Sequence, residues 1–136
     1  MRRTTIAKKK DEARELAKLC ARIADDKKGA HILVLRMTDV IVLTDYFVIA
    51  GGTNVRQVQA IADEINLTMH KLKVPCLGVE GLNSGTWVLL DYGDVVVHVF
   101  DEPTRDFYAL EHLWGDAPRV RWRKAVPAVK PEGETP

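Results

Sequence analysis

The nucleophiles and general bases of this sequence do not combine into a recognisable catalytic group. Ser84 is the only serine among the 136 residues, and it lacks the Gly-x-Ser-x-Gly frame of a hydrolase nucleophile. The four histidines are dispersed and match no zinc-binding spacing. His98 lies in an apolar run, which favours a hydrogen-bonded structural histidine over a general base. We therefore expect a binding protein rather than an enzyme, with no catalytic residues, cofactor or metal.

Two further patterns could hold a ligand. Asp91 and Asp94 flank a two-residue turn and could share a divalent cation, but we identify no third acidic ligand. Asp residues and Gly93 are sufficient to explain that turn. Gly51 and Gly52 precede a helix whose free N–H groups could bind phosphate, yet no third spaced glycine or Lys-Ser/Thr pair follows. We favour simple turns, and a nucleotide-binding enzyme of nucleotidyltransferase type stays an alternative.

Aromatic and charged residues are concentrated between residues 81 and 114, which favours a protein interface. Aromatic and Arg side chains at the centre with charges at the rim are typical of an interface hot spot. Trp87 and Trp114 could equally be core residues. Tyr92, in a turn, and Tyr108, on the polar side of a helix, are expected at the surface. The charged neighbours are Asp91, Asp94, Arg105 and Glu111.

The net charge of +1 conceals an uneven distribution. Residues 1–29 carry ten Lys/Arg and five Asp/Glu, residues 30–114 carry five and eleven, and residues 115–136 carry five and three, giving +5, −6 and +2. An acidic body favours a basic protein as its partner. It disfavours DNA or RNA as the main target, because phosphate binding needs a basic surface. A small RNA-binding protein that uses the basic ends is a third hypothesis.

The sequence gives no sign of a membrane segment. No apolar run is long enough to span a bilayer, and the charged N-terminus does not resemble a secretion signal. Cys20 and Cys76 lie far apart without metal-binding spacing. We expect a cytoplasmic protein with reduced thiols and no membrane partner.

Hydrophobic periodicity predicts a single α/β domain. Residues 4–26 and the stretch after Asn54 have helical spacing, and a third helix follows Asp101. Apolar runs at 32–35, 45–50, 76–79, 86–90 and 95–100 predict strands, and the run at 40–43 is either part of a β-ribbon or a loop. In the run at 95–100 both alternating sets are largely apolar, so we expect a strand covered on both sides.

The C-terminal residues differ in composition from the rest. Prolines at 118, 127, 131 and 136 exclude a long helix. Residues 119–124 alternate basic and apolar side chains. They could form a short strand, a nucleic-acid contact or part of a loosely held tail.

Four stretches of the chain together resemble the ribosomal silencing factor family, also called the Iojap-like family. They are TDYFVIAGG, RQVQAIAD, GVEGLNSGTWVLLDYGDVVVHVF and RDFYALEHLW, in the same order and with ordinary spacing over residues 4–116. One departure is Arg36, where the family usually has an acidic residue. The resemblance implies a compact domain over residues 1–116, followed by a Pro-rich charged tail over 117–136. Its fold would be a mixed sheet of about five strands flanked by helices, related to the nucleotidyltransferase fold without its catalytic carboxylates.

The resemblance also implies a function that spacing alone does not give. Members of the family bind the large ribosomal subunit at its fourteenth protein and sterically block joining of the small subunit, which represses translation in nutrient limitation or stationary phase. A minor contact with ribosomal RNA and a homodimer that covers the aromatic patch are further expectations. The partner-binding residues implied by the matching motifs are Trp87, Asp91, Tyr92, Gly93, Asp94, Arg105, Tyr108, Glu111 and Trp114.

Overall fold

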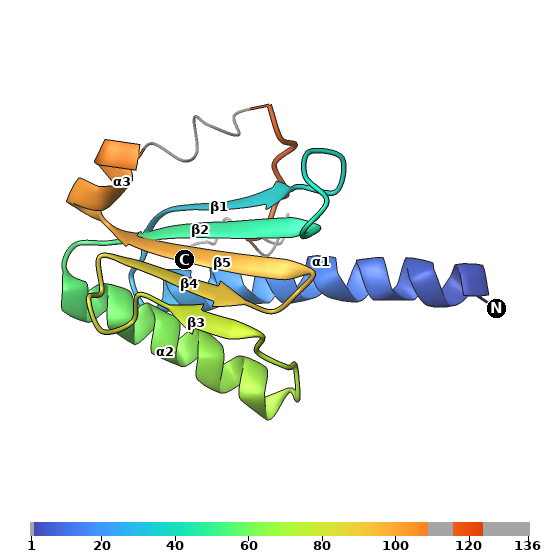
Figure 1. Cartoon of the computed structure of the whole chain (residues 1–136), viewed down its shortest axis with the longest axis horizontal. Helices are drawn as coiled ribbons and strands as arrows, with labels where there is room; N and C mark the ends of the chain where they lie inside the picture. Colours follow the sequence, from blue (N-terminus) through green and yellow to red (C-terminus); the bar gives the residue numbers. More distant parts are fainter. Residues whose placement is uncertain (1, 109–115, 124–136) are drawn as a thin grey trace, which may run out of the picture.

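The computed structural model describes residues 2–108 and 116–123, with side chains for 11–105 and 116–123. In this part of the chain, one sheet carries two long helices on the same side and a short helix at one end (Figure 1). The order agrees with the predicted helix, two strands, helix, three strands and helix. The elements are α1 (Arg2–Asp26), β1 (Ala30–Arg36), β2 (Tyr46–Gly52), α2 (Val55–Lys71), β3 (Gly78–Glu80), β4 (Trp87–Asp91), β5 (Val95–Asp101) and α3 (Glu102–Tyr108).

The sheet is mixed, with strand order β1-β2-β5-β4-β3. Its two most central neighbours, β2 and β5, run parallel, and the other three pairs are antiparallel. All seven residues of β2 are buried, because this strand has neighbours on both edges and packing on both faces. The predicted single α/β domain with a five-stranded mixed sheet is confirmed, and its relation to the nucleotidyltransferase fold stays a prediction.

Helices α1 and α2 bury their apolar stripes against one face of the sheet. On α1 most of the buried side chains are small, which lets the helix lie close to the strands; beside Ile23 they are Ala13, Ala17, Cys20, Ala21 and Ala24. On α2 they are larger: Val58, Ile61, Ala62, Ile65 and Met69. Asn54 caps α2, since its side chain accepts a hydrogen bond from the Gln57 backbone N–H at 2.8 Å.

The opposite face of the sheet carries both aromatic and aliphatic side chains. Because side chains alternate along a strand, Val95, Val97 and Val99 of β5 face the helices, and His98 and Phe100 face away from them. His98 and Phe100 are buried as well, so the prediction that this strand is covered on both sides is confirmed for them. We call this second surface the aromatic face; it contains Leu35, Phe47, Ile49, Trp87, Leu89, Val96, His98 and Phe100.

The run at residues 40–43 is a loop rather than part of a β-ribbon. It lies between β1 and β2, at the end of the sheet that also holds the β4–β5 turn (Figure 1). This arrangement leaves three of its apolar side chains exposed, Val40 in part and Val42 and Leu43 almost fully.

Residues 116–123 pack against the domain instead of forming a loosely held tail. The Arg36 N–H donates to Pro118 O and the Val120 N–H donates to Val34 O, both at 2.8 Å, so this segment lies antiparallel along the outer edge of β1. Trp122 is buried and donates through Nε1 to Ile32 O at 3.3 Å. The domain boundary predicted at 116/117 stays a prediction, and residues on its C-terminal side contact the domain.

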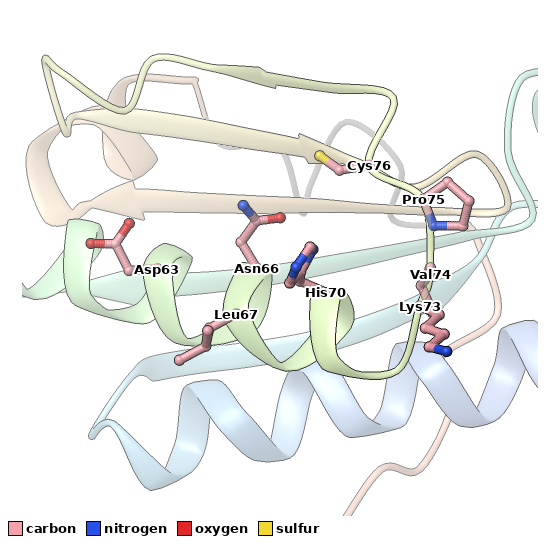
Figure 2. Close-up of a pocket in the computed structure, with 8 residues that line it drawn as sticks. All are labelled: Asp63, Asn66, Leu67, His70, Lys73, Val74, Pro75 and Cys76. Carbon is pink, nitrogen blue, oxygen red and sulfur yellow. The ribbon is translucent and has the colours of Figure 1, made fainter.

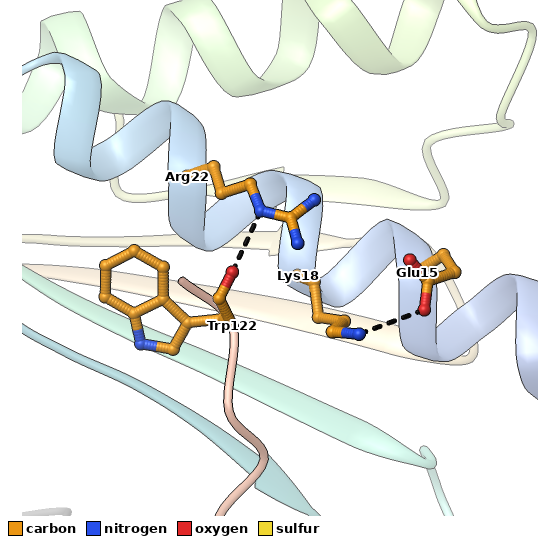
Figure 3. Close-up of polar contacts among 4 residues, drawn as sticks. All are labelled: Glu15, Lys18, Arg22 and Trp122. Carbon is orange, nitrogen blue, oxygen red and sulfur yellow. Dashed lines mark hydrogen bonds and ion pairs between the residues drawn. The ribbon is translucent and has the colours of Figure 1, made fainter. Parts of the chain in front are cut away.

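Helix α1 holds the same segment from the other side. Figure 3 shows the Arg22 Nε–H donating to Trp122 O at 2.8 Å. Arg123 forms an ion pair of 3.6 Å with Asp25 and places its guanidinium 4.5 Å from the centre of the Trp122 ring. Of the described basic residues in this segment, Arg123 thus has partners within the protein, whereas Arg119 and Arg121 are exposed, so a nucleic-acid contact stays a hypothesis.

We predict that Trp122→Ala lowers the free energy of unfolding by about 3 kcal/mol, because it removes a buried aromatic ring. Arg121→Ala is the matched control: Arg121 is exposed, and its loss should change stability by less than about 0.5 kcal/mol. Urea denaturation followed by circular dichroism measures both. Equal stabilities for the two variants would show that the segment does not pack as described.

Candidate protein-binding surface

The aromatic face is organised around His98. The Trp87 Nε1–H donates to His98 Nδ1 at 3.2 Å. The His98 ring packs edge-on against the Phe47 ring, with ring centroids 4.7 Å apart. The ring centroids of Trp87 and Phe100 lie 4.9 Å apart. Four aromatic rings from β2, β4 and β5 therefore form one cluster, in which Trp87 keeps part of its surface exposed.

His98 is a hydrogen-bonded structural residue, as predicted. Burial lowers the pKa of its imidazole to about 4. Because Nδ1 accepts the hydrogen bond from Trp87, the proton of the neutral ring lies on Nε2. That atom is buried and has no hydrogen-bond partner among the described residues. A neutral imidazole enclosed by aromatic rings is poorly placed to act as a general base.

The β4–β5 turn forms as its sequence predicts. The Gly93 backbone adopts φ +87°, a left-handed conformation that favours glycine. One carboxylate oxygen of Asp91 accepts the Gly93 N–H at 2.8 Å. Asp94 has an exposed side chain, and its backbone oxygen accepts hydrogen bonds from the Asp45 and Tyr46 N–H groups at 3.1 and 3.0 Å. Asp91 thus shapes the turn, whereas the Asp94 carboxylate points to solvent.

Tyr92 corrects one expectation. We expected this side chain at the surface, but it is only 8% exposed and belongs to the core beneath the helices. It follows Asp91 on the strand path, so alternation turns it toward α2. There its hydroxyl donates to Asn66 Oδ1 at 2.7 Å. Burial also raises the Tyr92 pKa above its ordinary value, and the nearby Cys20 and Cys76 thiols add to the effect.

Arg105 corrects a second expectation, because it is buried rather than displayed. Its guanidinium donates to Ala30 O at 3.4 Å and to His31 O at 2.6 Å. A Cβ added to Gly51 would lie 3.3 Å from Arg105 Nη1, so the guanidinium lies close over that glycine. Arg105 therefore ties α3 to the start of β1.

The structure does not describe the side chains of three predicted partner-binding residues. Tyr108 is the last residue of α3, and its side chain lies outside the described part of the structure. Glu111 and Trp114 lie outside the described residues altogether. Their assignment as partner-binding residues stays a prediction.

Three candidates are brought together on one exposed strip. Trp87 and Asp91 share the aromatic face of β4, and Asp94 lies beside Asp91 in the turn. The sequence-based set missed three neighbours on the same strip: Glu80 lies opposite Leu89 in the β3–β4 ladder, and Val96 lies opposite Asp91. The alternation of β4 could have identified Leu89. We call this strip the docking face; it comprises Glu80, Trp87, Leu89, Asp91, Asp94 and Val96.

The docking face is acidic and partly apolar. Residues 78–101, which supply all of it, contain four Asp/Glu and no Lys or Arg. Glu80 and Asp94 are exposed, and Trp87, Leu89 and Val96 are partly exposed. Apolar side chains rimmed by charges of one sign are suited to a protein partner of the opposite sign.

Side chains of the protein accept hydrogen bonds from the backbone N–H groups at the start of α2. Asn54 accepts from the Gln57 N–H, and Gln57 Oε1 accepts from the Thr53 N–H at 2.7 Å. A Cβ at Gly52 would lie 2.9 Å from Val58 Cγ2, so this glycine is required by close packing of the strand on the helix. The geometry supports the strand-to-helix turn over a nucleotide site.

No metal centre is assembled within the described residues, where no three His, Cys, Asp or Glu side chains are grouped to hold an ion. A hollow of about 670 Å³ lies between α2 and the segment that follows it (Figure 2). Asp63, Asn66, His70 and Cys76 are among its lining residues, and Asn66 already accepts the Tyr92 hydroxyl. Among the described helices, none is long and apolar enough to cross a membrane.

We predict that Tyr92→Ala destabilises the fold by about 3 kcal/mol, since it removes a buried ring. Tyr92→Phe should cost about 1 kcal/mol, the value of the hydrogen bond to Asn66. Urea denaturation of both variants tests this, with the exposed Asp94→Ala as a control that stays close to the parent protein. If Tyr92→Ala were as stable as Asp94→Ala, the burial of Tyr92 would be wrong.

A second prediction concerns pH. The His98 imidazole has a pKa of 6.5 in the unfolded chain and of about 4 in the folded chain. The contribution of this group to the free energy of unfolding is therefore full above pH 6.5 and decreases as the pH falls toward 4. Between pH 7 and pH 5 the loss should be about 2 kcal/mol. His98→Gln, which does not titrate, should show a loss smaller by that amount. Parallel pH profiles for the two proteins would contradict the burial of a neutral imidazole.

Comparison with known proteins agrees with the resemblance drawn from the motifs. The family model described as "Ribosomal silencing factor during starvation" matches residues 10–135. Ribosomal silencing factor RsfS of Bacillus subtilis is 44% identical over 105 residues, covering 77% of this chain and 89% of that protein. The mouse protein named mitochondrial assembly of ribosomal large subunit protein 1 is 34% identical over 91 residues, covering 65% of this chain and 40% of its own length. A crystal structure of a Chromobacterium violaceum protein superimposes with a TM-score of 0.73 at 38% identity, covering 87% of this chain and 96% of that one. The chain therefore belongs to the ribosomal silencing factor family.

Proposed function

We propose that this protein binds the large ribosomal subunit through its docking face and thereby blocks joining of the small subunit. The partner within the large subunit is a basic protein, and the family resemblance implies that it is the fourteenth large-subunit protein. The block is steric, since an occupied intersubunit surface excludes the other subunit without any bond being made or broken. Translation is then repressed in nutrient limitation or stationary phase, in the compartment that holds the ribosomes, which we expect to be the cytoplasm.

The observation that carries this proposal is the composition of the docking face. Trp87, Leu89 and Val96 supply partly exposed apolar surface, and Glu80 and Asp94 supply exposed negative charge. No Lys or Arg between residues 78 and 101 offsets that charge. Such a surface attracts a basic protein at long range and excludes water at its centre. It repels the phosphate backbone of RNA, which limits any contact with ribosomal RNA to a minor one.

Family membership supports the ribosome as the setting. The relatives are named as ribosomal silencing factors or for assembly of the ribosomal large subunit. A regulatory role of this kind needs no assembled catalytic group. Two of the polar groups considered for chemistry serve the fold: His98 accepts a hydrogen bond from Trp87, and Asn54 caps α2.

The first experiment is co-sedimentation of the protein with purified large subunits at micromolar concentration, together with light scattering of subunit joining. We expect the protein to pellet with large subunits and to slow joining. Failure of both would refute the proposed function. Sedimentation of the protein alone in the same buffer measures whether it forms the predicted homodimer.

We predict that Glu80→Arg/Asp94→Arg weakens binding to the large subunit about tenfold or more, because two attractive charges become repulsive. Both side chains are exposed, so the fold should persist. Asp26→Arg/Asp63→Arg is the matched control with the same change in net charge on exposed positions of α1 and α2. The docking face would be misassigned if both double variants weakened binding equally or if neither did.

A further inference from the structure

The loop between β1 and β2 displays two adjacent apolar side chains to solvent. Val42 is 100% exposed and Leu43 is 89% exposed, the highest values among the large apolar residues of the described chain. A single exposed Leu needs no explanation, but two adjacent branched side chains at the tip of a loop form a contiguous apolar patch.

Hydrogen bonds within the loop hold its base closed. The Met37 N–H donates to Asp45 O at 2.7 Å, which joins the two ends of the loop. The Val40 and Ile41 N–H groups both donate to Met37 O, at 2.8 and 3.0 Å. Met37 is completely buried and Ile41 packs against the buried cluster of the aromatic face. The tip is therefore presented by a fixed base rather than by a free chain.

Arg36, at the end of β1, forms an ion pair within this loop. Its Nη2 lies 3.3 Å from an Asp39 carboxylate oxygen, so the residue at the end of β1 pairs with one inside the loop. The Asp39 side chain nevertheless remains 81% exposed. On the other side of the tip, Thr44 is buried and donates to Tyr46 O at 3.4 Å.

The loop is joined to one end of the docking face. The Asp94 backbone oxygen accepts hydrogen bonds from both Asp45 and Tyr46, which follow the loop tip. Figure 1 shows this loop and the β4–β5 turn at the same end of the sheet. The exposed Asp94 carboxylate and the apolar tip therefore belong to two segments with a shared attachment, so one partner surface can contact both.

From these contacts we infer that Val42 and Leu43 are an apolar anchor that packs against the same basic ribosomal protein that contacts the docking face. This inference rests on the proposed function and names two further contact residues for it. Asp94, which is exposed near the anchor, carries negative charge that a basic partner would neutralise, whereas the Asp39 carboxylate is already paired with Arg36. A loop already fixed in its binding conformation loses little conformational entropy on docking, so burial of its tip contributes to affinity.

The test is Val42→Ser/Leu43→Ser, measured as affinity for purified large subunits. Because both side chains are exposed, the unfolding free energy should change little, and circular dichroism checks this. We expect binding to weaken about 10- to 100-fold, the range for removing one or two buried aliphatic side chains from an interface. Leu67→Ser/Leu72→Ser is the matched control, since these side chains are 48% and 52% exposed at α2 and the turn after it. Its affinity should equal that of the parent protein.

The outcomes separate the inference from the proposed function. If the parent protein binds large subunits and Val42→Ser/Leu43→Ser binds equally well, the inference is overturned and the proposed function stands. If the parent protein does not bind, the proposed function itself fails. Sedimentation of the free protein provides a third readout: a loop variant that loses only self-association, with unchanged affinity for large subunits, would assign the tip to a homodimer and overturn the inference.

Discussion

The parallel pairing of β2 with β5 is the constraint on which the rest of the structure depends. It pairs residues 46–52 with residues 95–101, which are separated in the sequence by α2, β3 and β4. This pairing leaves β2 buried throughout. A central strand pair of this kind must be covered on both faces, because unpaired apolar surface on either side would remain in water. Helices α1 and α2 cover one face, and the aromatic rings around His98 occupy the other. The exposed docking face is the margin of that second layer.

Local patterns were sufficient to predict most of this architecture. Helical spacing identified the apolar stripe of α2 from Val58 to Met69, and Gly93 identified the turn between β4 and β5. Both predictions succeeded because each signal depends only on residues close together in the sequence. The apolar character of both sides of β5 correctly indicated a central strand, including the burial of His98. Within the candidate surface, Trp87, Asp91 and Asp94 lie together, as their short separation in sequence suggested.

What the sequence did not predict depends on contacts between distant residues. Tyr92 was assigned to the surface because it lies in a turn, yet alternation and an acceptor on α2 place it in the core. Arg105 binds backbone oxygens 74 and 75 residues earlier in the chain. Trp122 donates to a carbonyl 90 residues away, so a Pro-rich composition gave no indication of its burial. Periodicity reports which side of an element is apolar, but it does not reveal which distant element will meet a polar group.

The antiparallel segment along β1 has a consequence for how the sheet can associate. One outer edge is occupied, since the backbone groups of Val34 and Arg36 already pair with the chain's own residues 118–120. The other edge strand, β3, is only three residues long. Open strand edges are the usual templates for peptide addition and for edge-to-edge aggregation. A sheet with one edge covered and the other shortened resists growth in both directions, so a partner must recognise its faces and loops instead of extending it as another strand.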